Sequence, residues 1–147
     1  MRYLLIDHIT ELVEGKNIKG IKNVAMTEDF LEFHFPGYPV MPGVMVLEAM
    51  VQLTGWLEAA SSDFKNWFSL TRVKRCSYYG FALPGDQLEL SIEKVDGESP
   101  FYRAEANVKG KRRVRAEYEG EVIPLEEIDD PAEKRRFFGV LRREIGL

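Results

Sequence analysis

The amino-acid sequence predicts an α+β domain in which an antiparallel sheet of about five to six strands wraps around one long apolar helix. One observation is a stretch over residues 43–60 that is rich in Leu, Met and Ala and has apolar side chains on every helical face. Another is a set of segments in the second half that alternate apolar and polar residues. Because a helix that is apolar all round must be surrounded by protein, and each strand has one apolar face to cover, the two patterns complement each other.

The helix is predicted to begin directly after Pro42, since proline costs little at a helix start, where the amide has no partner within the helix. After Gly43, with which the stretch 43–60 begins, Gly55 is its only helix-breaking residue. The stretch is also far too long for a typical strand.

Strands are predicted both before and after this helix in the sequence. Residues 3–12 and 18–26 are aliphatic and β-branched, with a turn at 14–17, and Thr27 is expected to cap a short helical turn through Phe30. Residues 87–93, 102–108 and 113–119 alternate with period two, and Asp96-Gly97 and Lys109-Gly110 supply the turns. Residues 67–79 predict a further, less regular strand.

A second helix is predicted over residues 131–145, where Asp130 provides a cap and Pro131 the first helical position. Phe137, Leu141 and Ile145 recur every four residues, and the basic residues at 134–136 and 142–143 form a polar face. This helix either packs on its own domain or a dimer mate, or serves as a docking surface. We therefore expect one domain over residues 1–147, with a core of about 3–123 and a helical extension of about 130–146.

Composition narrows the function classes. The single cysteine, Cys76, rules out an intrachain disulfide and favours a cytoplasmic location. The net charge of −4 argues against broad nucleic-acid binding. The longest nearly uncharged run, 35–57, holds three prolines and Glu48, so no membrane span is expected. With His8, His34 and Cys76 as the soft ligands available, no metal site is expected.

Candidate chemistry lies between His34 and Gln52. Three prolines stiffen the loop that holds His34 before the helix, and Glu48 and Gln52 follow one turn apart on the helix. A neutral His34 can accept a proton, whereas Glu48 in an apolar setting is expected to have a raised pKa and act as an acid. Amides near Gly43 and Val44 could stabilise an enolate oxygen. Taken singly, each of His34 and Glu48 would more often be a structural residue, and only their combination with the proline loop and the helix amides favours catalysis.

The His-Phe-Pro-Gly sequence at 34–37 and the Leu-Glu-Ala-Met-x-Gln sequence at 47–52 resemble the signature of bacterial 3-hydroxyacyl-acyl-carrier-protein dehydratases. The similarity covers residues 4–121. It implies a hot-dog fold and conversion of (3R)-hydroxyacyl thioesters to trans-2-enoyl thioesters in fatty acid biosynthesis or a related pathway. It also implies a homodimer with shared sites, His34 of one subunit facing Glu48 of the other, and a possible trimer of dimers.

The resemblance further implies that the acyl chain runs in a tunnel beside the helix and arrives on the phosphopantetheine of an acidic acyl carrier protein. No other cofactor is implied, and Gln52, Phe35 and Pro42 would support the site. The chain departs from the family at Phe33, where glycine usually precedes the histidine, and in its additional helix from residue 131.

Two alternative functions stay open at this point, a hot-dog acyl thioesterase and a non-catalytic acyl-binding or assembly subunit. The basic residues of the predicted strands are either solvated or attract the carrier protein. They are Arg72, Lys74, Arg75, Lys109, Lys111, Arg112, Arg113 and Arg115.

Overall fold

The computed structural model describes residues 4–144, which form one six-stranded sheet and two α-helices. The strands are β1 (His8–Val13), β2 (Asn17–Asn23), β3 (Asn66–Tyr78), β4 (Gln87–Val95), β5 (Phe101–Val108) and β6 (Lys111–Pro124). The helices are α1 (Gly43–Ser61) and α2 (Pro131–Arg142), with short 3₁₀ turns at η1 (Asp29–Leu31) and η2 (Leu125–Glu127).

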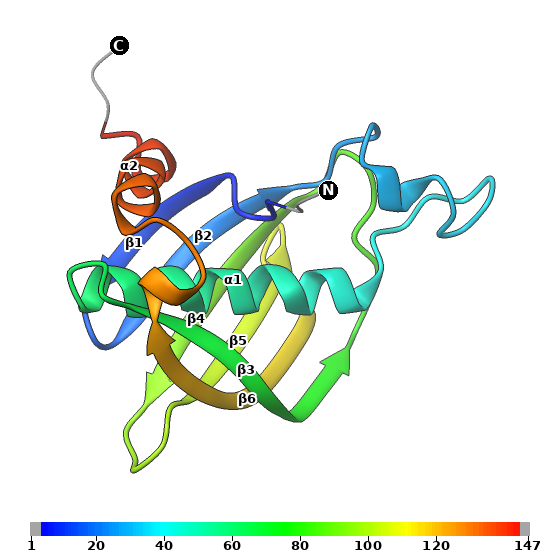
Figure 1. Ribbon diagram of the computed structural model, residues 1–147. Coiled ribbons are helices and arrows are strands. Elements are labelled where there is room, and N and C mark those ends of the chain that lie inside the picture. Colours follow the sequence, from blue (N-terminus) through cyan, green and yellow to red (C-terminus); the bar gives the residue numbers. More distant parts are fainter. Residues whose placement is uncertain (1–3, 145–147) are drawn as a thin grey trace.

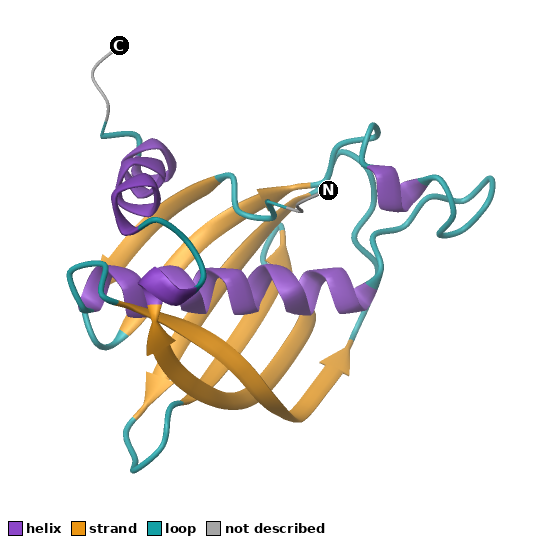
Figure 2. Cartoon of the chain, viewed as in Figure 1, coloured by secondary structure: helices purple, strands orange, loops and turns teal. Residues whose placement is uncertain are grey.

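All strand pairs are antiparallel, in the order β1-β2-β4-β5-β6-β3. The sheet curls around α1, so that strands lie on several sides of this helix (Figure 1). The predicted α+β architecture is therefore confirmed, and α1 ends within one residue of its predicted boundary. Figure 2 shows the same arrangement by element type, with α1 crossing the concave side of the sheet.

The core lies between α1 and the sheet. Met50, Leu53 and Leu57 of α1 are fully buried, as are the inward-facing side chains of the alternating strands. On β5, for example, Tyr102 and Ala106 are buried, as period-two alternation predicts.

The first strand begins later than predicted. Residues 4–6 precede β1, which starts at His8, and the amide of Leu5 donates to Gln52 Oε1 at 3.0 Å instead of to a neighbouring strand. Leu5 and Ile6 are still buried, which explains why their apolar character predicted a strand. Residue 3, the predicted start, lies outside the described residues.

The predicted cap at Thr27 is wrong. The turn η1 begins after Glu28, and no side chain caps it. The Glu28 carboxylate instead forms an ion pair with Lys22 of β2, which is buried. This pair ties the loop before α1 to the sheet.

The helix α2 begins at Pro131 as predicted, and the Asp130 side chain caps it by accepting from the Ala132 amide at 3.0 Å. It ends at Arg142, earlier than predicted, because Arg143 adopts the left-handed conformation with φ of 59° and its amide bonds back to carbonyls of the last turn. The predicted position Ile145 lies outside the described residues.

The helix α2 packs on its own chain. The rings of Phe137 and Phe138 lie 6.0 Å and 5.9 Å from that of Trp56 on α1, and Leu141 is buried. Lys134, which the sequence placed on a polar face, instead points its ammonium group at two indole rings. In the described part of the chain, neither helix has the length and apolar character needed to cross a membrane.

Candidate active site

His34 belongs to the segment between β2 and α1. This segment lies at the end of the molecule where α1 begins (Figure 1). The Nδ1 atom of His34 is 3.1 Å from the Val40 carbonyl oxygen. Because a carbonyl oxygen can only accept, Nδ1 carries the hydrogen, and Nε2 of the neutral ring is left able to take a proton. The ring stacks on Phe35 with 4.1 Å between centroids, and the peptide bond between these two residues is cis.

An open cavity of about 570 Å³ adjoins His34. Its walls come from the start of α1 at Pro42, Gly43 and Val44, and from the end of β3 and the following loop at Tyr78 and Phe81. The lining is largely apolar with a few polar groups, which is the usual composition of a small-molecule site.

Gly43 allows the close approach that shapes this cavity. A Cβ atom at this position would lie 2.3 Å from the ring of Tyr78, so any other residue would displace the ring. Burial and the neighbouring Cys76 raise the pKa of Tyr78 to about 12. The phenol, which belongs to the cavity wall, is therefore harder to ionise than that of an ordinary tyrosine.

The start of α1 faces the same cavity with free amide groups. No side chain caps this helix, and the amide of Met45 donates to the Pro42 carbonyl at 2.9 Å. The first amides of a helix have no acceptor within the helix, so those of Gly43 and Val44 can bind an oxygen that gains negative charge.

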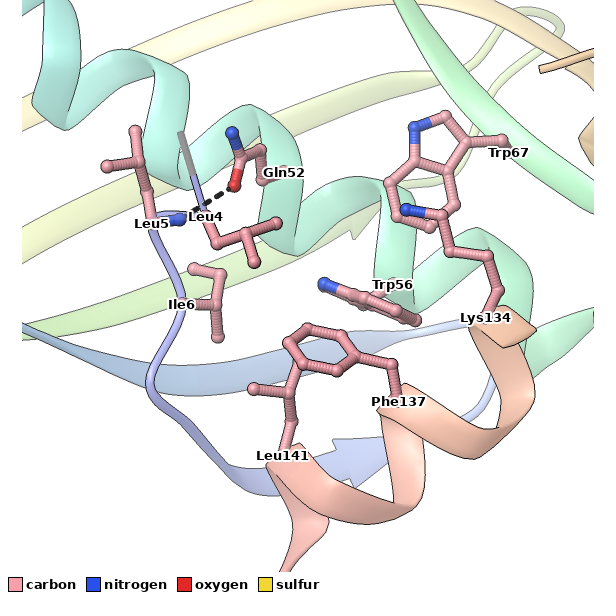
Figure 3. Close-up of a pocket in the computed structure, with 9 residues that line it drawn as sticks. All are labelled: Leu4, Leu5, Ile6, Gln52, Trp56, Trp67, Lys134, Phe137 and Leu141. Carbon is pink, nitrogen blue, oxygen red and sulfur yellow. Dashed lines mark hydrogen bonds between the residues drawn. The ribbon is translucent and has the colours of Figure 1, made fainter. Parts of the chain in front are cut away.

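Glu48 and Gln52 lie together on α1. Gln52 Nε2 donates to Glu48 Oε1 at 3.2 Å, while Gln52 Oε1 accepts from the Leu5 amide, the bond drawn in Figure 3. The amide side chain thus orients the carboxylate and is itself held by the N-terminal segment.

The expectation that the enveloping sheet buries Glu48 is wrong for the single chain. Glu48 is exposed, and Val44, one turn before it, is 65% exposed. The sheet covers the other faces of α1 and leaves this face open. Water has access to the carboxylate unless another surface covers it.

The structure therefore brings some of the predicted site residues together and keeps others apart. His34, Pro42, Gly43 and Val44 line one cavity, whereas Glu48 is not among the described residues that line it. Phe35 supports His34 by stacking, but its own side chain is half exposed. Within one chain, His34 therefore lines this cavity and the Glu48 carboxylate does not.

Sequence reasoning did not single out Tyr78 or Phe81 as parts of the site, and it treated Arg113 as one of many basic residues. All three line the His34 cavity. Arg113 Nε is buried and has no hydrogen-bond partner among the described residues. The run of aromatic residues around Gly80 was the available signal, because exposed aromatic side chains in a loop often mark binding sites.

Other residues considered from the sequence lie apart from this cavity. Phe33 is 76% exposed and is not among the described residues that line the cavity. His8 lies on β1, where burial and the nearby Arg143 and Arg142 lower its pKa. Across residues 4–144, no cluster of three or more His, Cys, Asp or Glu side chains is placed to hold a metal ion.

Comparison with known families decides the relationship. A family model described as a FabA-like domain matches residues 1–123, which covers the helix α1 and all the strands except the end of β6. The chain belongs to the FabA-like family. The match ends before α2.

Curated members of this family are similar along most of their length. The 3-hydroxyacyl-[acyl-carrier-protein] dehydratase FabZ of Clostridium botulinum (strain Okra) is 40% identical over 118 residues, which are 78% of this chain and 82% of that protein. FabZ of Nitratidesulfovibrio vulgaris is 40% identical over 119 residues, 78% of this chain and 77% of that protein. The chain is thus FabZ-like within the family.

Solved structures show the same fold at low identity. The dehydratase heterocomplex ApeI:P from Xenorhabdus doucetiae aligns with a TM-score of 0.63 at 16% identity, over 82% of this chain and 98% of that chain. A thioesterase superfamily member from Thermus thermophilus aligns with a TM-score of 0.61 at 20% identity, over 87% and 94%. These neighbours confirm the predicted hot-dog fold.

Proposed function

We propose that this protein removes water from (3R)-3-hydroxyacyl thioesters of acyl carrier protein, giving trans-2-enoyl thioesters for fatty acid biosynthesis or a related pathway. The observation that carries the proposal is the hydrogen bond from His34 Nδ1 to the Val40 carbonyl, which leaves Nε2 as a base beside the cavity. Membership of the FabA-like family and the FabZ relatives support the same chemistry.

In the proposed reaction, His34 Nε2 takes a proton from C2 of the substrate, and the electron pair moves onto the thioester oxygen. The amides of Gly43 and Val44 bind the enolate oxygen that forms. The C3–O bond then breaks, a double bond forms between C2 and C3, and the hydroxyl leaves as water with a proton from Glu48. The imidazolium later returns its proton to the carboxylate through water, so both His34 and Glu48 regain their starting protonation states.

Glu48 needs a second subunit for this role. A carboxyl group favours its neutral form only when it is withdrawn from water, and in the single chain Glu48 is exposed. We therefore propose that a second subunit covers Glu48 in a homodimer, in which His34 of one subunit faces Glu48 of the other. The exposed apolar side chains of Val44, Tyr78 and Phe81 near this surface support the assignment. Three such dimers would form a hexamer.

A product assay tests the reaction. The protein is incubated with a 3-hydroxyacyl thioester while enoyl absorbance and free thiol are followed together. Enoyl formation that disappears in both His34→Ala and Glu48→Gln supports the dehydratase. Thiol release without enoyl would show a thioesterase, and no reaction at any chain length would show an acyl-binding subunit.

A mixing experiment tests the shared site. The two inactive variants, His34→Ala and Glu48→Gln, are dissociated together and allowed to reassociate. If each site combines residues of two subunits, mixed dimers hold one complete site, and roughly a quarter of the wild-type activity returns. If each site belongs to one chain, no activity returns, and the assignment to the homodimer is wrong.

The proposed partner is an acidic acyl carrier protein in the cytoplasm, which presents the substrate on phosphopantetheine. Exposed basic side chains on β3 and β6 suit such a partner. They are Arg72, Lys74, Arg75, Arg112 and Arg115. Since the chain's own groups supply the acid, the base and the oxyanion contacts, the reaction uses no metal or cofactor, and turnover is expected to survive dialysis against a chelator.

A further inference from the structure

A second cavity, of about 240 Å³, lies away from His34, where α2 meets α1. Figure 3 shows its walls, which come from four separate parts of the chain. The segment 4–6 forms one side, Gln52 and Trp56 of α1 form the floor, and Trp67 of β3 and Phe137 of α2 close it. Apart from the Gln52 amide and one lysine, these walls are hydrocarbon and aromatic rings.

The cavity is connected to the proposed acid through Gln52. This side chain binds the Glu48 carboxylate and also lines the cavity. Glu48, Gln52 and Trp56 follow one another at intervals of four residues, so they lie along one face of α1. A chain that starts at Glu48 and follows this face runs directly into the cavity.

The geometry sets a length for such a chain. At 1.5 Å per residue, the rise along α1 is roughly 6 Å from Glu48 to Gln52 and about 12 Å to Trp56. An extended polypeptide advances about 3.6 Å per residue, which is about 1.2 Å for each of its three backbone bonds. We take the same advance of about 1.2 Å per bond for an extended acyl chain. With C3 of the substrate at Glu48, an acyl chain would enter the cavity at roughly eight carbons and reach Trp56 at roughly thirteen.

The helix α2 packs against the two tryptophans at the end of the second cavity that is farther from Glu48. Lys134 Nζ lies 4.6 Å from the centroid of the Trp67 ring and 5.1 Å from that of Trp56, and it is also 3.7 Å from Asp129 Oδ2. Such cation–π contacts join α2 to both indoles. The match to the FabA-like family ends at residue 123, so α2 comes from a part of the chain beyond the shared domain.

We propose that this cavity receives the hydrocarbon end of the acyl chain and that α2, chiefly through Phe137, limits the length of chain the enzyme accepts. The inference rests on the proposed dehydratase function and adds a specificity-determining element to it. Medium-length chains would fill the cavity, which has space for roughly eight water-sized groups of about 30 Å³ each. Longer chains would meet the ring of Phe137.

Fluorescence tests the site without any turnover. The chain has two tryptophans, Trp56 and Trp67, and both line this cavity, so its indole emission reports on the cavity alone. Saturated acyl-pantetheine thioesters of increasing length are added, which bind but cannot lose water. We expect emission to shift only for chains longer than about eight carbons. An equal response to short and long chains, or none to long chains that calorimetry shows to bind, would overturn the proposal.

A pair of variants tests the role of α2. Phe137→Ala removes a ring that lines the cavity, whereas Phe138→Ala removes a ring that packs equally close to Trp56 but does not line it. The two variants therefore lose a similar contact with Trp56, and Phe138→Ala also loses a contact with Phe64. Turnover is measured as kcat/KM for 3-hydroxyacyl thioesters from four carbons upward.

Phe137→Ala should move the upper length limit to longer chains, with activity on the four-carbon substrate within about twofold of wild type because the reacting groups are untouched. Phe138→Ala should keep the wild-type length profile. Identical profiles for both variants would contradict the role of Phe137. If the wild type dehydrates no substrate at all, the proposed function fails, while the fluorescence result still decides whether the cavity binds acyl chains.

Discussion

The two ends of α1 are built for different purposes. Among residues 43–48 at its start, only Val46 is buried. The free amides and Glu48 belong to this end of the helix, and His34 lies in the loop that precedes it. From Leu53 to Ala59, every residue is buried. One helix therefore presents the proposed reactive groups at its open end and holds the domain together at its closed end, so substitutions at the two ends should separate activity from stability.

The closed end contains a buried polar network. Glu58 accepts from Lys94 Nζ at 2.7 Å and from the Tyr102 hydroxyl, while the hydroxyls of Thr54 and Tyr118 lie 2.6 Å apart. Burial raises the pKa of both tyrosines, and the Glu58 carboxylate raises that of Tyr102 further. These bonds satisfy polar groups that would be costly to bury alone, and they fix the helix against the sheet.

The largest expected effect is at the open end. His34→Ala should lower kcat by about 10²- to 10⁴-fold, the usual contribution of a general base. The free energy of unfolding should change by no more than about 1 kcal/mol, since one hydrogen bond to Val40 is lost. Turnover and urea denaturation are measured on the same preparation. A large loss of stability with activity retained would show that His34 serves the fold and not the reaction, which would contradict the division between the two ends of α1.

Two glycines on α1 provide a matched pair. A Cβ atom at Gly55 would lie 2.3 Å from the ring of Trp67, and one at Gly43 equally close to that of Tyr78. Trp67 packs against Trp56, so Gly55→Ala should destabilise by about 1–2 kcal/mol, after the gain in helix propensity offsets part of the overpacking. Tyr78 is half exposed and can swing aside, so Gly43→Ala should reduce turnover with little loss of stability.

Denaturation of both glycine variants in urea, together with the dehydratase assay, checks this contrast. Equal stability losses in Gly43→Ala and Gly55→Ala would mean that the open end carries as much of the fold as the closed end.

Alkaline pH should weaken the closed end. Because burial raises the pKa of Tyr118 and Tyr102 above the ordinary value of 10.0, the unfolded chain ionises first. Their stabilising contribution is complete below pH 10 and is lost as the pH rises beyond it, by about 1.4 kcal/mol per pH unit for each tyrosine. Tyr118→Phe should make this decline shallower, and Tyr79→Phe, on an exposed ring, should leave it unchanged. An identical decline in all three proteins between pH 10 and 11 would contradict the prediction.

The smallest expected effect is on the encounter with the carrier protein at the open end. Raising the salt concentration from about 0.05 M to about 0.5 M should lower kcat/KM for the carrier-bound substrate several-fold, because the exposed basic side chains are screened. The same substrate on pantetheine lacks the protein and should be unaffected. Equal salt dependence for both substrates would show that the basic side chains do not attract the carrier protein.

Much of the fold could be predicted because its signals are local. The unbroken apolar stretch, the period-two alternation of β4 to β6 and the Asp130-Pro131 cap each depend on neighbours in sequence. The start of β1 could not be predicted, since Leu5 and Ile6 are apolar and buried whether a strand or the Gln52 side chain satisfies their backbone.

The candidate site divides in the same way. The sequence by itself determined the positions of His34, Glu48 and Gln52, because a fixed spacing in a rigid loop and a helix places them relative to α1. Only the tertiary structure decided that Glu48 is exposed on the single chain and that Lys134 turns inward onto Trp56 and Trp67. The exposure of a side chain and the walls of a cavity depend on contacts between segments that are distant in the sequence. No local pattern in the sequence predicts those contacts.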